Sequence, residues 1–120
     1  MAIPYALIVA LTAAASLPPS LVGTWQSADG RVVARIAPCS ADAAALCANT
    51  LIENAGATAA GRLVMTGLKP SQQAIWKGKY LLDGNALPAT LRLVGADLVE
   101  IKVCRWFLCQ SDRYRRVEAR

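Results

Sequence analysis

Apolar and polar residues alternate along most of the chain after residue 20. The segment Leu98–Cys104 shows the pattern clearly, because Val99 and Ile101 lie on one face of an extended chain. Glu100 and Lys102 lie on the other face. A period of two residues is typical of an antiparallel strand that has one face buried and the other in water. The pattern therefore predicts an all-β protein with little or no helix after its apolar leader.

Turn signals divide this alternation into short strands at intervals of about ten residues. Asp29-Gly30 is a dipeptide that favours a hairpin turn, and Asp83-Gly84-Asn85 is interpreted as a further turn. The predicted strands are Leu21–Ser27, Arg31–Pro38, Leu46–Glu53, Ala74–Leu82, Ala86–Val94, Leu98–Cys104 and Cys109–Glu118. Between the third and fourth of these, Asn54–Gly61 is interpreted as a flexible connection, and Arg62–Leu68 is ambiguous between strand and turn.

Seven or eight short strands predict either a sandwich or a closed barrel. Closure is favoured because it leaves no unpaired edge strand. A barrel of about eight strands is either filled by its own side chains or holds one small ligand. Because the strands are short, we expect the interior to be filled, with little cavity.

The first 20 residues carry no charged side chain and contain an apolar run, Tyr5–Leu17, that ends in small residues. This pattern is typical of a secretory signal peptide. The run has roughly 13 residues, fewer than the ~20 that a spanning helix needs, which favours cleavage over a retained anchor. We predict a signal peptide over residues 1–16 and a single domain over 17–120. The domain is then periplasmic or secreted, without stable membrane insertion after cleavage.

The chain has four cysteines, Cys39, Cys47, Cys104 and Cys109. An even number of cysteines in a small exported domain indicates disulfides, and four cysteines permit three pairings. Cys39–Cys47 and Cys104–Cys109 are favoured because each pair is local and brackets a turn. A zinc site is disfavoured, because the chain has no His and the cysteine spacings are not those of a zinc motif.

The net charge of +5 is concentrated near the C-terminus. Residues 101–120 hold six basic and two acidic side chains, a net charge of +4. Such a patch can attract nucleic acid, anionic lipid or an acidic protein. Export argues against nucleic acid, and an ordinary solvated strand face is the simpler interpretation.

One aromatic residue near the start and one cation near the end stand out. If the first and last strands of a barrel are neighbours, Arg116 can lie on the indole of Trp25, an arrangement that stabilises by ~0.5–2 kcal/mol. Gly23 then allows the close approach of another group. Two interpretations stay open, a plug that closes one barrel end and a ligand-contacting end, and the plug is favoured.

Several segments form a recognisable set: Gly23-Thr24-Trp25, Asp29-Gly30, Leu46-Cys47, Trp76-Lys77-Gly78 and the tail from Cys104 through Leu108-Cys109-Gln110-Ser111-Asp112-Arg113-Tyr114-Arg115-Arg116-Val117. Together they resemble the small exported bacterial proteins of the family named domain of unknown function 2147. The resemblance implies a calycin-like, antiparallel, up-and-down β-barrel in which a Gly-x-Trp of the first strand packs under an Arg of the last. The family usually has Trp in place of Tyr114. The resemblance implies no established activity.

The sequence offers no catalytic constellation, because His is absent and the acidic residues form no suggestive pair. We therefore expect a monomeric, non-enzymatic protein without cofactor or metal. The first function considered is a binding module for a small apolar ligand. The alternative is a protein-interaction or inhibitor-type barrel of the cell envelope. Trp106 and Phe107 lie between the last two cysteines and form either a partner- or membrane-facing tip or a loop folded over the barrel mouth.

Overall fold

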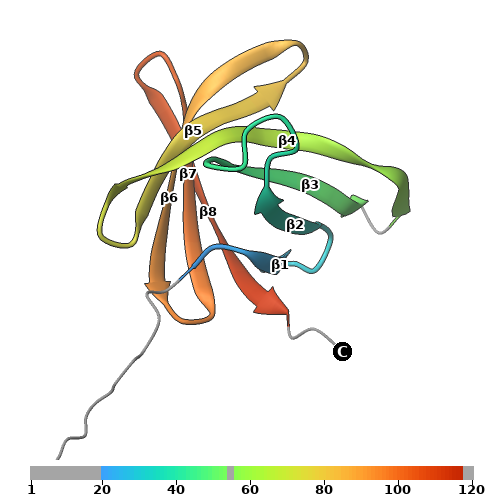
Figure 1. Ribbon diagram of the computed structural model, residues 1–120. Helices are drawn as coiled ribbons and strands as arrows, with labels where there is room; N and C mark the ends of the chain where they lie inside the picture. Colours follow the sequence, from blue (N-terminus) through green and yellow to red (C-terminus); the bar gives the residue numbers. More distant parts are fainter. Residues whose placement is uncertain (1–19, 54–55, 118–120) are drawn as a thin grey trace, which may run out of the picture.

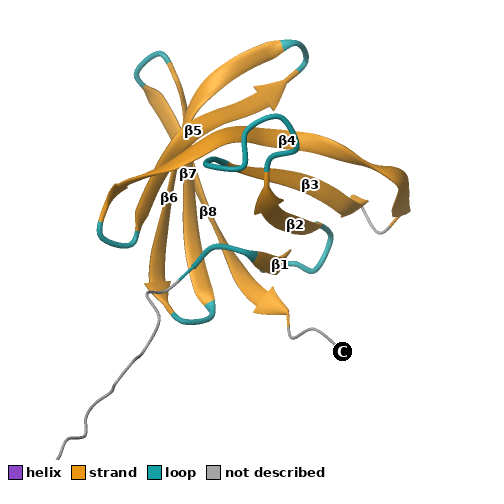
Figure 2. Cartoon of the chain, viewed as in Figure 1, coloured by secondary structure: helices purple, strands orange, loops and turns teal. Residues whose placement is uncertain are grey.

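The computed structural model describes residues 20–53 and 56–117, so the predicted signal peptide lies outside the described residues. This part of the chain forms an all-β barrel, in which every element is a strand or a loop (Figure 1, Figure 2). The strands are β1 (Gly23–Ser27), β2 (Val33–Pro38), β3 (Leu46–Glu53), β4 (Gly56–Gln72), β5 (Ile75–Leu82), β6 (Asn85–Gly95), β7 (Leu98–Arg105) and β8 (Leu108–Val117). No helix in the described ranges is long and apolar enough to cross a membrane.

Each strand pairs antiparallel with the next, and β1 pairs with β8, which closes the barrel. This is the up-and-down topology, and it leaves no edge strand unpaired. The prediction of a small antiparallel barrel is confirmed. In the closing ladder, Trp25 stands opposite Arg116.

The turn predicted at Asp83-Gly84-Asn85 joins β5 to β6 through Asp83 and Gly84, and Asn85 already begins β6. Asp83 and Gly84 have positive φ angles of 48° and 82°. Positive φ at both central positions is the geometry of the two-residue turn that matches the strand twist. Leu82 and Asn85 pair directly across the turn, so the sequence identified this turn correctly.

The strand β4 differs most from the sequence prediction. Asn54–Gly61 was predicted to be a connection, but the strand already begins at Gly56 and continues through the ambiguous segment Arg62–Leu68. The pairing of β4 with β3 and β5 contains several register shifts. Val64 and Met65 are consecutive, and both are 4% exposed. Bulges of this kind interrupt the period of two, which is why alternation alone missed the strand.

The barrel has two unlike ends. The closed end lies where the chain enters at Ser20 and where the β6–β7 turn approaches β8; the open end carries the β5–β6 and β7–β8 turns (Figure 1). Leu21, Leu68 and Leu91 are fully buried, with no exposed surface. None of these three residues lines the interior cavity. The packed core therefore fills the closed end and leaves the open end hollow.

Two disulfides reinforce the fold, and both have the predicted pairing. Cys39–Cys47 ties the β2–β3 loop to β3, with 4.9 Å between the Cα atoms. Cys104–Cys109 joins directly paired residues of β7 and β8. Cross-links of this kind suit a small domain whose core is limited in size.

Candidate functional site: the barrel cavity

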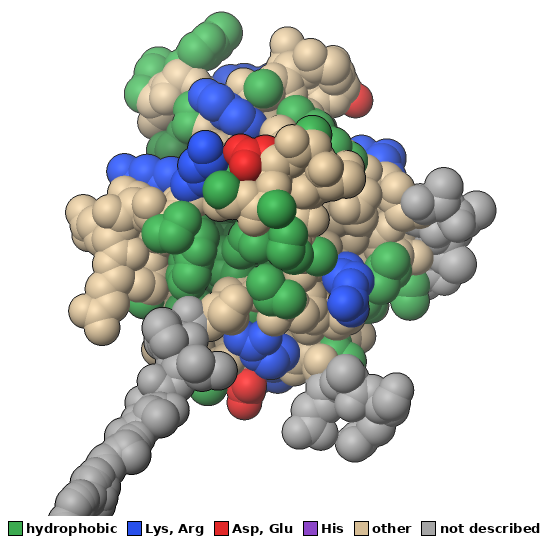
Figure 3. Space-filling model, viewed as in Figure 1, with side chains coloured by type: hydrophobic (Ala, Val, Ile, Leu, Met, Phe, Trp, Pro, Cys, Tyr) green, Lys and Arg blue, Asp and Glu red, His purple; other side chains and the backbone are tan. Residues whose placement is uncertain are grey.

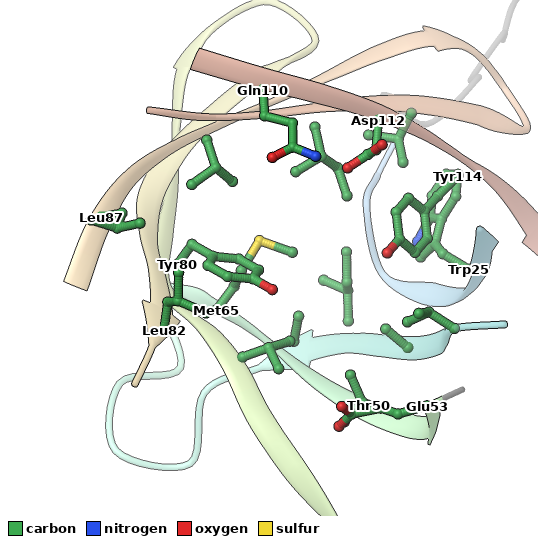
Figure 4. A pocket seen from close by; sticks show the side chains of 18 of the residues that line it. Trp25, Thr50, Glu53, Met65, Tyr80, Leu82, Leu87, Gln110, Asp112 and Tyr114 are labelled. Atoms are coloured by element: carbon green, nitrogen blue, oxygen red, sulfur yellow. The ribbon is translucent and has the colours of Figure 1, made fainter. Parts of the chain in front are cut away.

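The open half of the barrel encloses a cavity of about 740 Å³ (Figure 4). The expectation of little cavity was therefore wrong. Ala34 and Ala48 occupy inward positions of β2 and β3 that border the space. Short side chains at these positions leave room that larger residues would fill. The volume lies within the range of about 300–1,000 Å³ that is usual for small-molecule sites.

Most of the cavity wall is apolar. Ile36 and Met65 contribute from β2 and β4, and Leu87, Ile101 and Val103 contribute from β6 and β7. These residues face inward because each strand alternates between the barrel interior and the solvent. A wall of this composition favours an apolar ligand, which loses water contact when it enters.

Polar side chains from β8 form a second part of the wall. Gln110, Asp112 and Tyr114 follow one another at every second position, and all three line the cavity. Tyr80 of β5 points into the same space from the opposite side, across from Gln110 (Figure 4). An amide, a carboxylate and two phenols thus offer donors and acceptors to a ligand beside the apolar part of the wall.

The phenol of Tyr114 stays neutral over the physiological pH range. Burial disfavours its phenolate, the charge of Asp112 adds to the effect, and together they raise the pKa of Tyr114 to about 12. The carboxylate of Asp112 makes no ion pair with any residue in the ranges 20–53 and 56–117. It is the anionic group of the β8 side of the wall.

A closed hydrogen-bond cluster forms part of the rim. Arg62 donates to both carboxylate oxygens of Glu53, at 2.9 Å and 2.6 Å, and the Thr50 hydroxyl donates to the same carboxylate. The hydrogen bonds from Arg62 and then Thr50 lower the pKa of Glu53 to about 2. These groups satisfy one another, so the cluster ties β3 to β4 at the rim.

Trp25 and Arg116 meet at the floor of the cavity. The guanidinium carbon of Arg116 lies 4.3 Å from the centroid of the Trp25 ring. Trp25 is 1% exposed and lines the cavity, whereas Arg116 does not line it. The indole therefore separates the cation from the ligand space, and the pair forms a plug.

Backbone carbonyls fix the position of this guanidinium. Arg116 donates to the carbonyl oxygens of Ala96, Val22 and Ser20 at 3.0, 2.9 and 2.8 Å. A Cβ atom at Gly23 would lie 2.8 Å from Arg116 Nη1, so the absence of a side chain there admits the cation. The structure thus brings Gly23, Trp25 and Arg116 together in one arrangement.

The β7–β8 turn projects from the open end. Trp106 and Phe107 are 87% and 85% exposed. The alternative in which this loop folds over the mouth is wrong for the structure described. Arg105 and Leu108 flank the turn and also line the cavity, so the tip stands beside the mouth.

Gln110, Asp112 and Tyr80 were not identified as site residues from the sequence. A signal for the first two was available, because they lie at the same alternate positions of β8 as Tyr114 and Arg116 and therefore on the same face of the strand. Polar residues at inward positions of a barrel strand usually indicate a cavity rather than a packed core. Tyr80 had no comparable signal, since an inward Tyr also fits a packed interior.

Comparisons of the chain with family models, with curated proteins and with solved structures give no match. The class of the protein is therefore stated from its fold and its site alone. It is a small closed β-barrel with one plugged end and one open end that leads into a cavity of ligand size.

Proposed function

We propose that the protein is an exported binding module that holds a small apolar ligand inside its barrel, without catalysis. The observation that supports this most directly is the cavity of about 740 Å³ with its largely apolar wall. A filled barrel of the same topology would have no space for a ligand.

Export is part of the proposal. The two disulfides are compatible with an oxidising compartment such as the periplasm. The apolar leader supports the same location. Membership of the family named domain of unknown function 2147 also stays a proposal, which the contact between Trp25 and Arg116 supports.

The wall also suggests the form of the ligand. An apolar body fits against residues such as Met65 and Ile101, and one polar end carrying a hydrogen-bond donor fits the carboxylate of Asp112. Beside Asp112 an anionic end would be repelled, whereas Arg105, a cation that lines the cavity, stands at the mouth. The proposed ligand is therefore an apolar molecule whose polar end at Asp112 is neutral or cationic.

Titration with the neutral fluorescent dye N-phenylnaphthylamine tests this proposal. We expect saturable fluorescence enhancement with the native protein. Val103→Trp places a large ring in the cavity and should weaken dye binding by about tenfold or more. Lys102→Trp places the same ring on the outer face of the same strand and should leave binding within about twofold. Melting curves verify that both variants fold; equal dye binding by the two variants would rule out the cavity as the site.

A second candidate is a protein-interaction barrel of the cell envelope. The exposed aromatic residues at the β7–β8 turn favour it, because exposed apolar groups often mark contact surfaces. Native mass spectrometry of protein purified from its own envelope separates the two functions. A co-purifying small molecule supports the ligand-binding module, and a clean apo mass supports the interaction barrel.

A further inference from the structure

The β7–β8 turn forms an apolar tip that is largely exposed to solvent. Trp106, Phe107 and Leu108 are 87%, 85% and 63% exposed. Figure 3 shows hydrophobic side chains projecting at the end of this hairpin, with basic side chains close below them. We call these three residues the apolar tip.

The hairpin that carries the tip is held in shape. Arg105 pairs with Leu108 across the turn, and the disulfide Cys104–Cys109 lies at the next register position. A cross-linked hairpin loses little conformational freedom when its tip inserts into another phase. Trp106 and Phe107 are thus already held in an exposed position before the tip meets a partner.

The outer wall of β5–β8 below the tip is basic. Its exposed cations are Lys77, Lys79, Arg92, Lys102, Arg113 and Arg115. Glu100 is the acidic residue on this wall, so the wall has a net charge of +5. We call this surface the basic wall.

Register places these cations in rows. Thr90 pairs with Lys77 on one side and with Lys102 on the other. Glu100 accepts from Arg92 at 2.8 Å and lies 3.8 Å from Arg113. Among the described residues, Lys77 and Lys102 have no carboxylate partner and remain available to an external anion.

The tip and the wall are close enough to act together. Lys102 precedes Trp106 by four residues, a distance of about 13 Å along a strand. A membrane interface presents anionic headgroups and an apolar interior over a comparable depth. Trp and Phe favour that interface, and Lys and Arg favour anionic headgroups.

The shape of the surface favours a bilayer over a protein partner. A stable protein interface buries about 800 Å² on each side and is usually built around a broad apolar patch. The tip is a narrow hairpin end of three apolar residues, and the surface behind it is charged. A fluid lipid layer accepts a narrow convex insertion without needing a matching pocket.

We propose that this protein docks peripherally on an anionic lipid surface, with the apolar tip inserted and the basic wall against the headgroups. Arg105, which flanks the apolar tip, and Leu108, which belongs to it, both line the cavity, so docking would bring the mouth to the lipid. The proposal does not depend on what the cavity holds.

Flotation of the full disulfide-bonded protein with lipid vesicles tests the docking. We expect binding to phosphatidylcholine vesicles that contain about one quarter phosphatidylglycerol, and weak binding to pure phosphatidylcholine, at about 0.15 M salt. Trp25 and Trp76 are buried, so a blue shift of tryptophan fluorescence on binding reports Trp106. Absence of binding to the anionic vesicles would overturn the proposal.

Removal of the tip gives the sharpest comparison. Trp106→Ser with Phe107→Ser should weaken vesicle binding by about tenfold or more, because the inserted apolar area is lost. The control Leu51→Ser with Leu63→Ser removes two exposed apolar residues of β3 and β4, 39% and 41% exposed, and should bind within about twofold of the native protein. Binding that survives loss of the tip, including binding through the leader, overturns the proposal.

Removal of wall charges tests the second component. Lys77→Gln with Lys102→Gln should weaken binding to anionic vesicles by about fivefold. Arg31→Gln with Arg35→Gln removes the same charge from the β1–β2 side and should have a smaller effect. Equal losses for the two pairs would contradict docking through the basic wall. Tighter binding to a DNA duplex or to an acidic protein, independent of the tip, would likewise reject lipid as the partner.

Discussion

The closed and open ends of the barrel are built from the same strands but are filled in different ways. At the closed end, Leu91 of β6 is fully buried and belongs to the core around Trp25. Four residues earlier on the same strand and face, Leu87 lines the cavity. The alternation of the strand is identical at both positions, so the difference comes from the side chains that the neighbouring strands contribute. Stability is thus concentrated at one end of the barrel and space for a ligand at the other.

Leu91→Ala and Leu87→Ala test this contrast with one substitution on one strand. Leu91→Ala should lower the free energy of unfolding by about 3 kcal/mol, because it opens a void in a packed core. Leu87→Ala should lower it by about 1 kcal/mol, since its side chain already borders empty space. Urea denaturation of both variants measures the difference. Similar losses would mean that the open end is packed as tightly as the closed one.

Arg116→Ala should destabilise the barrel by about 2 kcal/mol, because it removes both the cation–π contact and three hydrogen bonds to backbone carbonyls. Arg115 lies on the outer face of the same strand, and Arg115→Ala should change stability by less than about 0.5 kcal/mol. Thermal melts compare the two variants. Equal shifts in Tm would show that Arg116 does not hold the closed end together.

Gly23→Ala should cost about 1–1.5 kcal/mol. The new Cβ would lie 2.8 Å from Arg116 Nη1, and the φ of +145° at this position disfavours a side chain. Gly95→Ala is the control, because its Cβ would meet nothing within 4 Å. In an Arg116→Ala background, Gly23→Ala should lower the stability only by the cost of a side chain at the positive φ of this position. An equal loss of stability in both backgrounds would show that Gly23 does not act through its contact with Arg116.

Much of the closed end was predictable from sequence, because it depends on local patterns and on one long-range pairing. The strand bounds of Leu46–Glu53 match the prediction. Closure of an antiparallel barrel brings the first and last strands together, so Trp25 and Arg116 became neighbours once the strand count was known. Both disulfides, including Cys104–Cys109 beside the turn at the open end, were predicted because each pair is local and brackets a turn.

The open end was less predictable for physical reasons. The cavity volume depends on the summed sizes of inward side chains across several strands and on the irregular register of β4. No single segment contains that information. The alternation of residues along β8 was enough to predict that Gln110 and Asp112 face inward. Their role as site residues depends on a cavity that the sequence did not reveal.

The rim cluster should contribute a small, pH-dependent part of the stability of the open end. The pKa of Glu53 is lowered from 4.5 to about 2, first by Arg62 and then by Thr50. A carboxyl with a lowered pKa in the folded state stabilises above the unfolded value and loses that contribution as the pH falls towards the folded value. The stabilisation from Glu53 is therefore present above pH 4.5 and fades between about 4.5 and 2.

Melting temperatures of the native protein and of Glu53→Gln, measured from pH 7 to pH 2, check this contribution. The two curves should be separated by a small constant difference at neutral pH and should converge as the pH approaches about 2, because protonation removes the same charge that the substitution removes. Asp29→Asn is the control at the β1–β2 turn, where the pKa is also lowered but no Arg–carboxylate fork joins two strands. At neutral pH the curve of Asp29→Asn should lie closer to the native curve than the curve of Glu53→Gln does. A Glu53→Gln curve that stays parallel to the native one down to pH 2 would contradict the role of the carboxylate at the rim.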